Sequence, residues 1–251
     1  MRVTSCGITD VGLKRNHNED NYLINDELNL FVVADGMGGH AGGEYASAIC
    51  VNTVEEVVMS MELGESVPVD VDDPIEAARE RLRYAIVLAG RRIHEKAGKN
   101  SEFHGMGTTV VVLLFDGQNA LVAHVGDSRV YLVRDGRVEQ VTEDHSLVNE
   151  KLRAGLLSPE EAKNHKMRNV ITRSLGYLED VEVDVEVHAV RRGDRFVLCS
   201  DGLSGHVEDS EIVEHVTLYG PQEGARRMVD LACQRGGEDN ITVVVVRVDE
   251  S

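Results

Sequence analysis

Three apolar segments that are far apart in the chain each end or begin within two residues of an aspartate, and this pattern constrains the fold more than any other feature. The segments and their aspartates are 30–34 with Asp35, 196–199 with Asp201, and 241–246 with Asp239. Short apolar runs of this kind are typical of buried strands. A carboxylate at the end of a buried strand costs free energy unless a cation meets it. We therefore expect distant strands to converge where these aspartates share a cation site.

The chemistry of these side chains indicates which cation they would bind. All the donors are hard oxygens, and no Cys or His pattern with metal-ligand spacing accompanies them. Oxygen-only sites suit Mg²⁺ or Mn²⁺ rather than zinc or copper. The sequence therefore predicts a magnesium or manganese centre.

Asp-Gly pairs are also the strongest short signal for a hairpin turn, so each pair needs its own interpretation. The pairs at 116–117 and 135–136 lie between two ordinary strands, which favours turns. Asp35 is followed by a Gly-rich loop and then a helix, and Asp201 also leads toward a helix. Neither fits a two-residue hairpin, and clustered carboxylates without a cation would repel one another. These two positions therefore favour a shared site.

Two further polar places are candidates with open alternatives. Asp127 follows the apolar segment 120–125, where it can be either a ligand or a turn residue that caps local backbone. Arg15, Glu19 and Asp20 lie in one polar stretch, which is also consistent with a solvated loop. The residues alone do not decide between these interpretations.

Hydrophobic periodicity predicts a mixed fold. The expected strands are 3–9, 22–24, 30–34, 108–115, 120–125, 129–133, 138–141, 181–187, 196–199 and 241–246, and the expected helices are 44–59, 74–97, 208–216 and 221–235. Asp73 and Pro74 are typical of the N-cap and first position of a helix. The four strands from 108 to 141 are expected to form one β-meander, which implies antiparallel pairing. Because the long helices come in sequential pairs, we expect an α+β fold with two sheets packed face to face and helices outside.

Residues 146–170 differ from their surroundings. They carry short helical patterns with a break at Gly155 and a capping box that begins at Ser158. We expect a helical insert between strands, acting as a flap or as a cover for a sheet edge. We expect residues 1–251 to form a single domain around this insert.

Charge and cysteine content limit the possible partners. With 26 Lys and Arg against 44 Asp and Glu, the net charge is −18, which disfavours nucleic acid and anionic membranes. The 4 cysteines include no C-x-x-C pair, so we expect free thiols of a reducing compartment. No apolar run is long enough to span a bilayer. We therefore expect a cytoplasmic protein.

The Gly-rich segment 36–43 permits a competing interpretation as a dinucleotide-binding loop. It follows a strand, precedes a helix, and has Glu55 or Glu56 near the place of a ribose-binding acid. However, the Asp35 carboxylate would lie beside the pyrophosphate, and the strands that follow do not form alternating βαβ units. Binding of NAD would support this alternative, but we do not favour it.

An ordered set of motifs carries a family resemblance. The motifs are 15–20 (RNHNED), 33–39 (VADGMGG), 107–109 (GTT), 125–129 (VGDSR), 144–146 (DHS), 172–176 (TRSLG), 200–203 (SDGL) and 238–242 (EDNIT). Together they resemble the metal-dependent protein phosphatases of type 2C in their stand-alone bacterial form. The resemblance covers nearly the whole chain, and the ordered set is specific although each motif alone is weak.

The resemblance implies a four-layer α-β-β-α sandwich with a binuclear Mn²⁺ or Mg²⁺ centre at one end. By this resemblance, Asp35 would bridge the two metals and the Gly36 carbonyl would bind one of them. Asp201 and Asp239 would complete the pair. Asp127, with Asp201, matches the ligands of a weaker third metal.

The same resemblance implies roles around the metals. Glu19 and Asp20 would be ligands through water, Arg15 would clamp the phosphate, and Asn240 would support the ligands from behind. Animal members place a histidine as general acid directly after the Asp-Gly pair, where this chain has Met37. His40 could replace it, or could be an ordinary loop histidine, in which case a metal-bound water would be the acid.

The resemblance implies a phosphatase acting on phosphoserine and phosphothreonine of proteins, opposing Ser/Thr kinases. We expect a monomer. The alternative is a catalytically inactive member that only binds a partner. Such members usually lack a metal-ligand aspartate, and here every expected aspartate is present.

Overall fold

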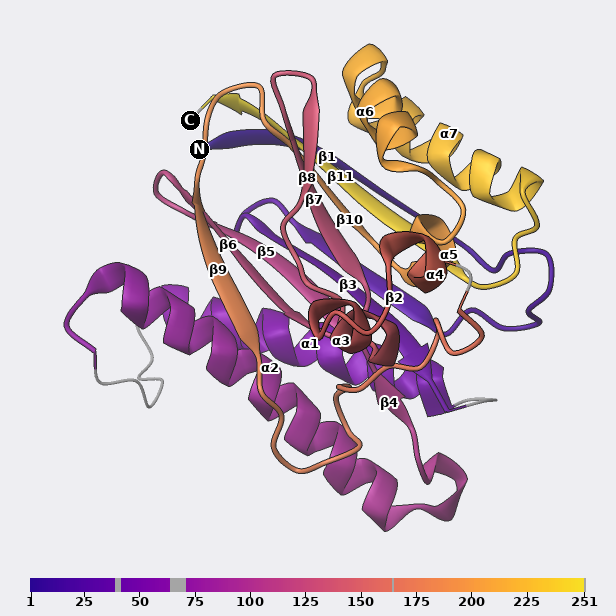
Figure 1. The fold of residues 1–251 in the computed structure, drawn as a ribbon. Helices are drawn as coiled ribbons and strands as arrows, with labels where there is room; N and C mark the ends of the chain where they lie inside the picture. The colour runs from indigo at the N-terminus through magenta and orange to yellow at the C-terminus, as the bar shows by residue number, and fades with distance from the viewer. Residues whose placement is uncertain (39–41, 64–70, 164, 251) are drawn as a thin grey trace.

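The computed structural model describes residues 1–38, 42–63, 71–163 and 165–250, in which two antiparallel sheets pack face to face (Figure 1). One sheet has the order β1 (Arg2–Asp10), β11 (Ile241–Glu250), β10 (Arg195–Cys199), β7 (Arg129–Arg134) and β8 (Arg137–Gln140). The other has the order β2 (Asp20–Asn25), β3 (Leu30–Met37), β5 (Val110–Asp116), β6 (Asn119–Val125) and β9 (Asp184–Ala189), with β4 (Gly107–Thr108) paired to β3. The first and last strands of the chain pair with each other, so the two termini lie close together.

Helices cover both outer faces of the sandwich. The second sheet is covered by α1 (Gly42–Glu62) and α2 (Pro74–Lys99), and the first by α6 (Asp209–Leu218) and α7 (Pro221–Gln234) (Figure 1). The short elements are η1 (Ser101–Phe103), α3 (Leu147–Arg153), α4 (Pro159–Lys163) and α5 (Asp201–Ser204). The α+β prediction with two antiparallel sheets and helices on both sides is therefore confirmed.

The central strands contain unbroken apolar runs because both of their faces are buried. In β3, Phe31 packs between the sheets while Leu30 and Val32 pack against the helices of the outer face. Between the sheets, the ring of Phe115 lies 6.1 Å from that of Phe31 and 5.5 Å from that of Phe196, both in edge-to-face geometry. The unbroken apolar runs of the sequence are thus explained by strands with helices on one side and a second sheet on the other.

Helix α2 begins where the sequence predicted, with Asp73 as its N-cap. The Asp73 carboxylate accepts hydrogen bonds from the backbone N–H groups of Ile75 at 3.0 Å and Glu76 at 2.9 Å. Pro74 occupies the first helical position, where its missing N–H costs nothing.

The expectation of one four-stranded meander between 108 and 141 is wrong. The hairpin β5–β6 belongs to one sheet and the hairpin β7–β8 to the other. The chain crosses between the sheets at Gly126, whose φ of +109° favours glycine and where an added Cβ would lie 2.6 Å from the side chain of Thr109. This crossover brings Asp127 to the edge of the sandwich, which an ordinary meander would not do.

Two smaller differences concern the end of the chain. Strand β9 begins at Asp184 rather than at Val181, and the short helix α5, which begins at Asp201, was not expected as a separate element. Within the described ranges, no helix is long and apolar enough to cross a membrane.

Candidate metal centre

The folded chain gathers five aspartates, which we call the acidic centre. Its members are Asp20 on β2, Asp35 on β3, Asp127 after β6, Asp201 at the start of α5 and Asp239 just before β11. The pKa of Asp35 is raised well above its usual value, by burial first and then by the charges of the other four. Because these charges act on one another, the five aspartates lie close together. The strands that carry them therefore converge, as expected from the apolar segments.

Asp20 and Asp35 form the floor of the acidic centre. They face each other as cross-strand partners on β2 and β3. One carboxylate oxygen of Asp20, Oδ2, accepts hydrogen bonds from the hydroxyls of Ser200 at 2.8 Å and Thr242 at 2.6 Å. The other oxygen, Oδ1, is buried without a hydrogen-bond partner among the described residues. Because a buried anionic oxygen is costly when unsatisfied, this atom indicates a place for a cation or its water.

Asp201 contacts Asp35 across the boundary between the two sheets. A hydrogen bond joins their side chains. Burial and the charge of Asp239 raise the pKa of Asp201, while burial is also the main cause that raises the pKa of Asp20 to about 6. Two carboxyl groups in contact require either a shared proton or a cation between them. The arrangement is therefore electrostatically incomplete without positive charge.

Asp127 extends the acidic centre on the side of the β6–β7 crossover. Burial, followed by the charges of Asp201 and Asp144, raises the pKa of Asp127 to about 7. Next to it, the hydroxyls of Ser128 and Thr109 lie 2.7 Å apart in a hydrogen bond that ties the crossover to β5. Asp127 lies in the sharp turn of the crossover, a position consistent with its interpretation as a turn residue.

Arg15 is the cation in contact with this group. Its Nη2 lies 2.7 Å from Oδ2 of Asp239, and its side chain is 54% exposed. The hydrogen bond to Asp239 raises the pKa of Arg15, so the guanidinium stays charged. Among the described residues, Arg15 acts on Asp239 and Asp201, and the charge of Arg129 acts on Asp127. Two arginines do not balance five carboxyl groups, so most of the negative charge remains uncompensated.

Asn240 ties the first polar loop to the start of β11. Its Oδ1 accepts the backbone N–H of Glu19 at 2.8 Å, and its Nδ2 donates to the carbonyls of Val11 at 3.0 Å and His17 at 2.9 Å. The backbone N–H of Asn240 in turn donates to Oδ1 of Asp239 at 2.9 Å. One amide side chain thereby fixes Asp239 relative to Glu19 and the loop that carries Arg15.

Close packing explains the glycines beside the aspartates. A Cβ on Gly36 would lie 2.2 Å from the Gly43 carbonyl oxygen and 2.4 Å from that of Glu19. A Cβ on Gly43 would lie 1.9 Å from Oε2 of Glu19. Burial raises the pKa of Glu19, whose carboxylate therefore lies inside this packed corner. Gly36 and Gly43 thus allow three segments to approach, which accounts for these two glycines without a dinucleotide.

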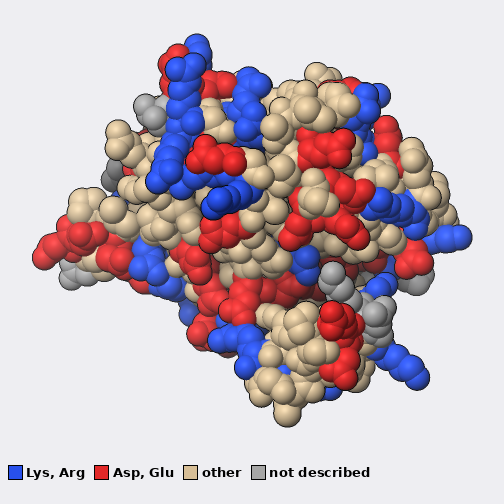
Figure 2. Space-filling model, turned by 45° about the horizontal axis from the view of Figure 1, so that its top comes forward, with Lys and Arg blue, Asp and Glu red and all other residues tan. Residues whose placement is uncertain are grey.

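The outer surface over this region is acidic. Figure 2 shows Asp and Glu side chains gathered around a recess on one face of the molecule. His40, the candidate general acid, lies outside the described residues. No role as partners of Asp20 was predicted for Ser200 or Thr242, although each lies within one of the motifs at 200–203 and 238–242.

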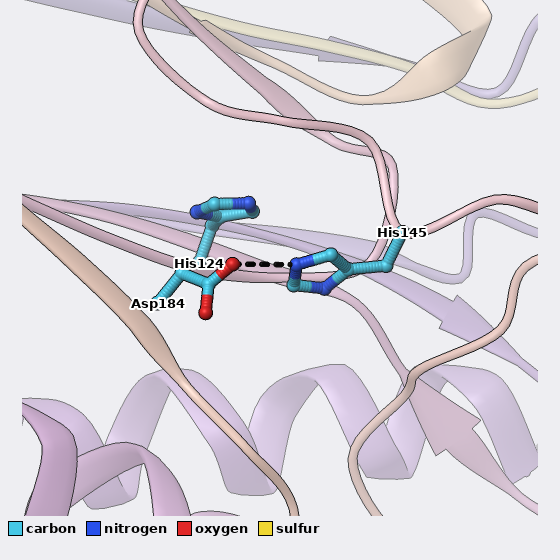
Figure 3. A group of neighbouring side chains, drawn as sticks. All are labelled: His124, His145 and Asp184. Carbon is cyan, nitrogen blue, oxygen red and sulfur yellow. Dashed lines mark hydrogen bonds and ion pairs between the residues drawn. The ribbon is translucent and has the colours of Figure 1, made fainter. Parts of the chain in front are cut away.

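A second group of possible metal ligands lies beside the acidic centre. One ligand atom from each of His124, His145 and Asp184 lies within 4.8 Å of the other two (Figure 3). With Arg173, which lies 3.5 Å from Asp184, we call this group the histidine clasp. No motif spacing in the sequence had pointed to it as a group.

The donor set of the acidic centre fits hard divalent cations. Its ligand atoms are carboxylate oxygens, with the Gly36 carbonyl nearby, and thiols are absent from it among the described residues. Oxygen donors of this kind bind Mn²⁺ and Mg²⁺. The unsatisfied Oδ1 of Asp20 and the raised carboxyl pKa values are the features that such cations would relieve.

Comparisons with known proteins place these features in context. The model of the protein phosphatase 2C family matches residues 14–234. The chain is 37% identical over 247 residues to protein phosphatase PhpP of Streptococcus pneumoniae, covering 97% of this chain and 96% of PhpP.

Solved structures agree with the sequence comparisons. The serine/threonine phosphatase PstP/Ppp of Mycobacterium tuberculosis superposes with a TM-score of 0.88 at 35% identity, over 99% of each chain. The catalytic domain of PstP, solved in complex with 2 manganese ions, superposes with a TM-score of 0.84 at 34% identity, also over 99% of each chain.

Proposed function

The chain belongs to the protein phosphatase 2C family, and from this premise we propose how its own side chains remove phosphate from phosphoserine and phosphothreonine. It is a metal-dependent protein-serine/threonine phosphatase, a phosphoric monoester hydrolase. The observation that carries the finer proposal is the convergence of Asp20, Asp35 and Asp201 around a buried oxygen that lacks a partner among the described residues.

We assign Asp35, Asp201, Asp239 and the Gly36 carbonyl to a pair of Mn²⁺ or Mg²⁺ ions. The PstP catalytic domain that superposes on this chain was solved with 2 manganese ions, which supports that number. The donors here are oxygens that suit both metals.

We further assign Asp127, together with Asp201, to a weaker third ion. Glu19 and Asp20 would contact the ions through water, which suits the buried Oδ1 of Asp20. When bound, divalent cations supply charge neutralisation of the phosphate and an activated water nucleophile.

Arg15 is assigned to the phosphate of the substrate. A guanidinium fork matches phosphate oxygens, and this side chain is exposed enough to change partner. Its contact with Asp239 holds it at the edge of the acidic centre until a phosphate arrives. His40 remains a candidate for protonating the serine or threonine oxygen that leaves.

The remaining assignments concern the surroundings of the site. We propose that residues 1–251 act as one phosphatase domain and that the insert 146–170, with α3 and α4, is a flap that gates access. The enzyme acts on phosphorylated proteins. We propose that it opposes Ser/Thr kinases as a cytoplasmic monomer, and its net charge of −18 argues against nucleic acid or anionic membranes as partners.

Hydrolysis of a phosphothreonine peptide by the purified chain tests this proposal. We expect turnover with Mn²⁺, no turnover with a chelator, and loss of turnover in Asp239→Asn. Asp116→Asn, in the β5–β6 turn away from the acidic centre, is the matched control and should retain full activity. A phosphotyrosine peptide assayed in parallel defines the specificity.

Unimpaired turnover by Asp239→Asn or in chelator would contradict the assigned mechanism. An inert wild-type chain that still binds a protein partner would instead favour the inactive-member alternative.

A further inference from the structure

The histidine clasp has a hydrogen-bond pattern that fixes the tautomer of His145. The backbone N–H of Gly126 donates to Nδ1 of His145 at 3.1 Å, so this nitrogen must carry a lone pair. The proton of the neutral ring therefore resides on Nε2, which donates to Oδ2 of Asp184 at 3.0 Å (Figure 3). Nη1 of Arg173 lies farther from this nitrogen, at 3.4 Å. The ring of His124 stacks on that of His145 with centroids 4.6 Å apart, and its Nε2 donates to the Glu143 carbonyl at 2.8 Å.

This pattern argues against a metal ion in the clasp. A metal would need the lone pair of Nε2 of His145, which would shift the ring proton to Nδ1 and oppose it to the N–H of Gly126. The place of a cation is also taken, because the Arg173 guanidinium lies 3.0 Å from Glu182 and 3.5 Å from Asp184. The clasp is therefore complete within the protein itself.

His145 also lies where both ends of the flap meet the β6–β7 crossover. Its backbone N–H donates to the Gly126 carbonyl at 2.9 Å, and its carbonyl accepts the N–H of Thr172 at 2.8 Å. Two residues further on, the N–H of Leu147 donates to the carbonyl of Val170 at 2.9 Å, which continues the pairing of the two flap ends. A single residue thus binds both the N–H and the carbonyl of Gly126, which belong to two successive peptide groups, and joins the two ends of the flap.

The backbone N–H of His145 holds the peptide that leads into Asp127, and its Nδ1 holds the preceding peptide, between Val125 and Gly126. Gly126 adopts a φ of +109°, and the residue after it projects its carboxylate toward Asp201, whose charge raises the pKa of Asp127. A change in the backbone angles of Gly126, which both hydrogen bonds restrain, would point the side chain of Asp127 in a different direction. Groups behind a metal ligand commonly tune affinity by 10–100-fold.

We propose that His145 is a positioning residue that orients Asp127 in the acidic centre through Gly126 and couples it to the base of the flap through Asp184. The metal-related part of this inference rests on the proposed role of Asp127 as a ligand. The two ring nitrogens have separate duties: Nδ1 aims Asp127, and Nε2 fastens the flap base to β9.

Two substitutions separate these duties. In His145→Asn, the side-chain oxygen can take the position of Nδ1 and still accept from Gly126, while the donor to Asp184 is lost. In His145→Gln, the amide nitrogen can reach the position of Nε2 and still donate to Asp184, while the acceptor for Gly126 is lost. A purely structural histidine would not distinguish the two variants in this order.

Calorimetric titration with Mn²⁺ should separate the variants. We expect His145→Asn to bind its weakest Mn²⁺ within about threefold of wild type, and His145→Gln to bind it at least about 10-fold more weakly. In metal-free protein, NMR should show the Gly126 amide and the Asp127 carboxyl carbon shifted in His145→Gln and close to wild type in His145→Asn. Exchange of the flap amides 147–153 should be faster in His145→Asn than in His145→Gln.

His188→Gln is the matched control, because His188 lies on β9 opposite Ala120, four residues along the strand from Asp184. It should leave all three measurements unchanged. Equal effects of Asn and Gln that follow only the melting temperature would overturn the proposal. Failure of wild type to bind Mn²⁺ would defeat the proposed function instead, and the metal-free Gly126 and Asp127 resonances would still decide the role of His145.

Discussion

The acidic centre and the histidine clasp are built from similar residues but differ in how their charges are balanced. In the clasp, His145 donates to one oxygen of Asp184 and Arg173 approaches the other. In the acidic centre, Asp20 has a buried oxygen without a partner among the described residues, and the contacting cation is the exposed Arg15. Proximity of carboxylates and histidines therefore does not identify a metal site; the unmet need for positive charge does.

The carboxyl pKa values show the same difference. Burial alone would raise the pKa of Asp184, but the hydrogen bond from His145 and nearby cationic side chains hold it below its usual value. In the acidic centre, burial and neighbouring carboxylates raise the pKa of Asp20 to about 6 and that of Asp127 to about 7. The clasp is stable as a closed unit, whereas the acidic centre becomes stable by binding cations.

The largest expected effects on turnover and on melting temperature come from removing one carboxylate from the acidic centre or from the histidine clasp. Asp35→Asn should reduce turnover of a phosphothreonine peptide by about 1,000-fold or more, equivalent to ~4 kcal/mol of activation free energy. Because it removes repulsion, it should raise the melting temperature of the metal-free protein. Asp184→Asn should lower that temperature, because it removes the carboxylate that accepts from His145 and one of the two that pair with Arg173.

Thermal unfolding in chelator and with Mn²⁺ tests whether the two substitutions shift the melting temperature in opposite directions. Mn²⁺ should raise the melting temperature of wild type and Asp184→Asn, and should have little effect on Asp35→Asn. Asp116→Asn again serves as the control for an Asp-to-Asn change in a turn. A lower metal-free melting temperature for Asp35→Asn would contradict the view that the acidic centre is electrostatically incomplete.

A smaller effect on turnover is expected from substituting Arg15, the exposed cation that contacts the acidic centre. Arg15→Ala should lower kcat/KM for a phosphopeptide by roughly 10–100-fold, since hydrogen bonds to charged groups contribute about 1.5–3 kcal/mol. Arg15→Lys should recover part of this loss, because an ammonium keeps the charge without the fork. Steady-state kinetics provide the measurement.

Calorimetry with Mn²⁺ is the control for Arg15, since its removal should leave metal affinity nearly unchanged. If Arg15→Ala instead lost Mn²⁺ binding while retaining kcat/KM at saturating metal, Arg15 would serve the metal centre rather than the substrate.

Only those members of the acidic centre that stand next to an apolar segment could be predicted from the sequence. Asp35, Asp201 and Asp239 stand beside apolar segments, and a carboxylate next to a buried strand can be recognised from the sequence alone. The hydroxyl partners of Asp20 are not visible in this way, because Ser200 and Thr242 lie 180 and 222 residues from it in the chain. Their contacts exist only because β2 packs across the sandwich from β10 and β11.

The fold and the clasp show the same limit. Runs such as the one in β3 predicted strands buried on both faces, but the periodicity of β5 to β8 contains no sign of the change of sheet at Gly126. The clasp assembles residues from β6, β9 and both ends of the flap, so its members follow no motif spacing. What the sequence could not reveal in each case is contact between elements that are distant along the chain.

The smallest expected effect is a difference in the pH dependence of stability between the two groups. Asp127 has a folded pKa of about 7, against an unfolded value of about 3.9 for aspartate. The folded state therefore keeps a proton that the unfolded state releases, so this group contributes stability below pH ~4 and loses it as the pH rises through about 7. Asp184, with its pKa lowered, contributes a constant amount across the same interval.

Melting temperatures in chelator at pH 5 and pH 7.5 test this difference. Relative to wild type, Asp127→Asn should gain several degrees between pH 5 and pH 7.5, at roughly 2–4 °C per kcal/mol for a domain of this size. The difference between Asp184→Asn and wild type should stay constant. Because each variant is compared with wild type at the same pH, titration of the groups that the substituted side chain does not contact cancels. If the melting temperatures of Asp127→Asn and Asp184→Asn changed by the same amount between the two pH values, the acidic centre and the histidine clasp would not differ in how well their charges are balanced.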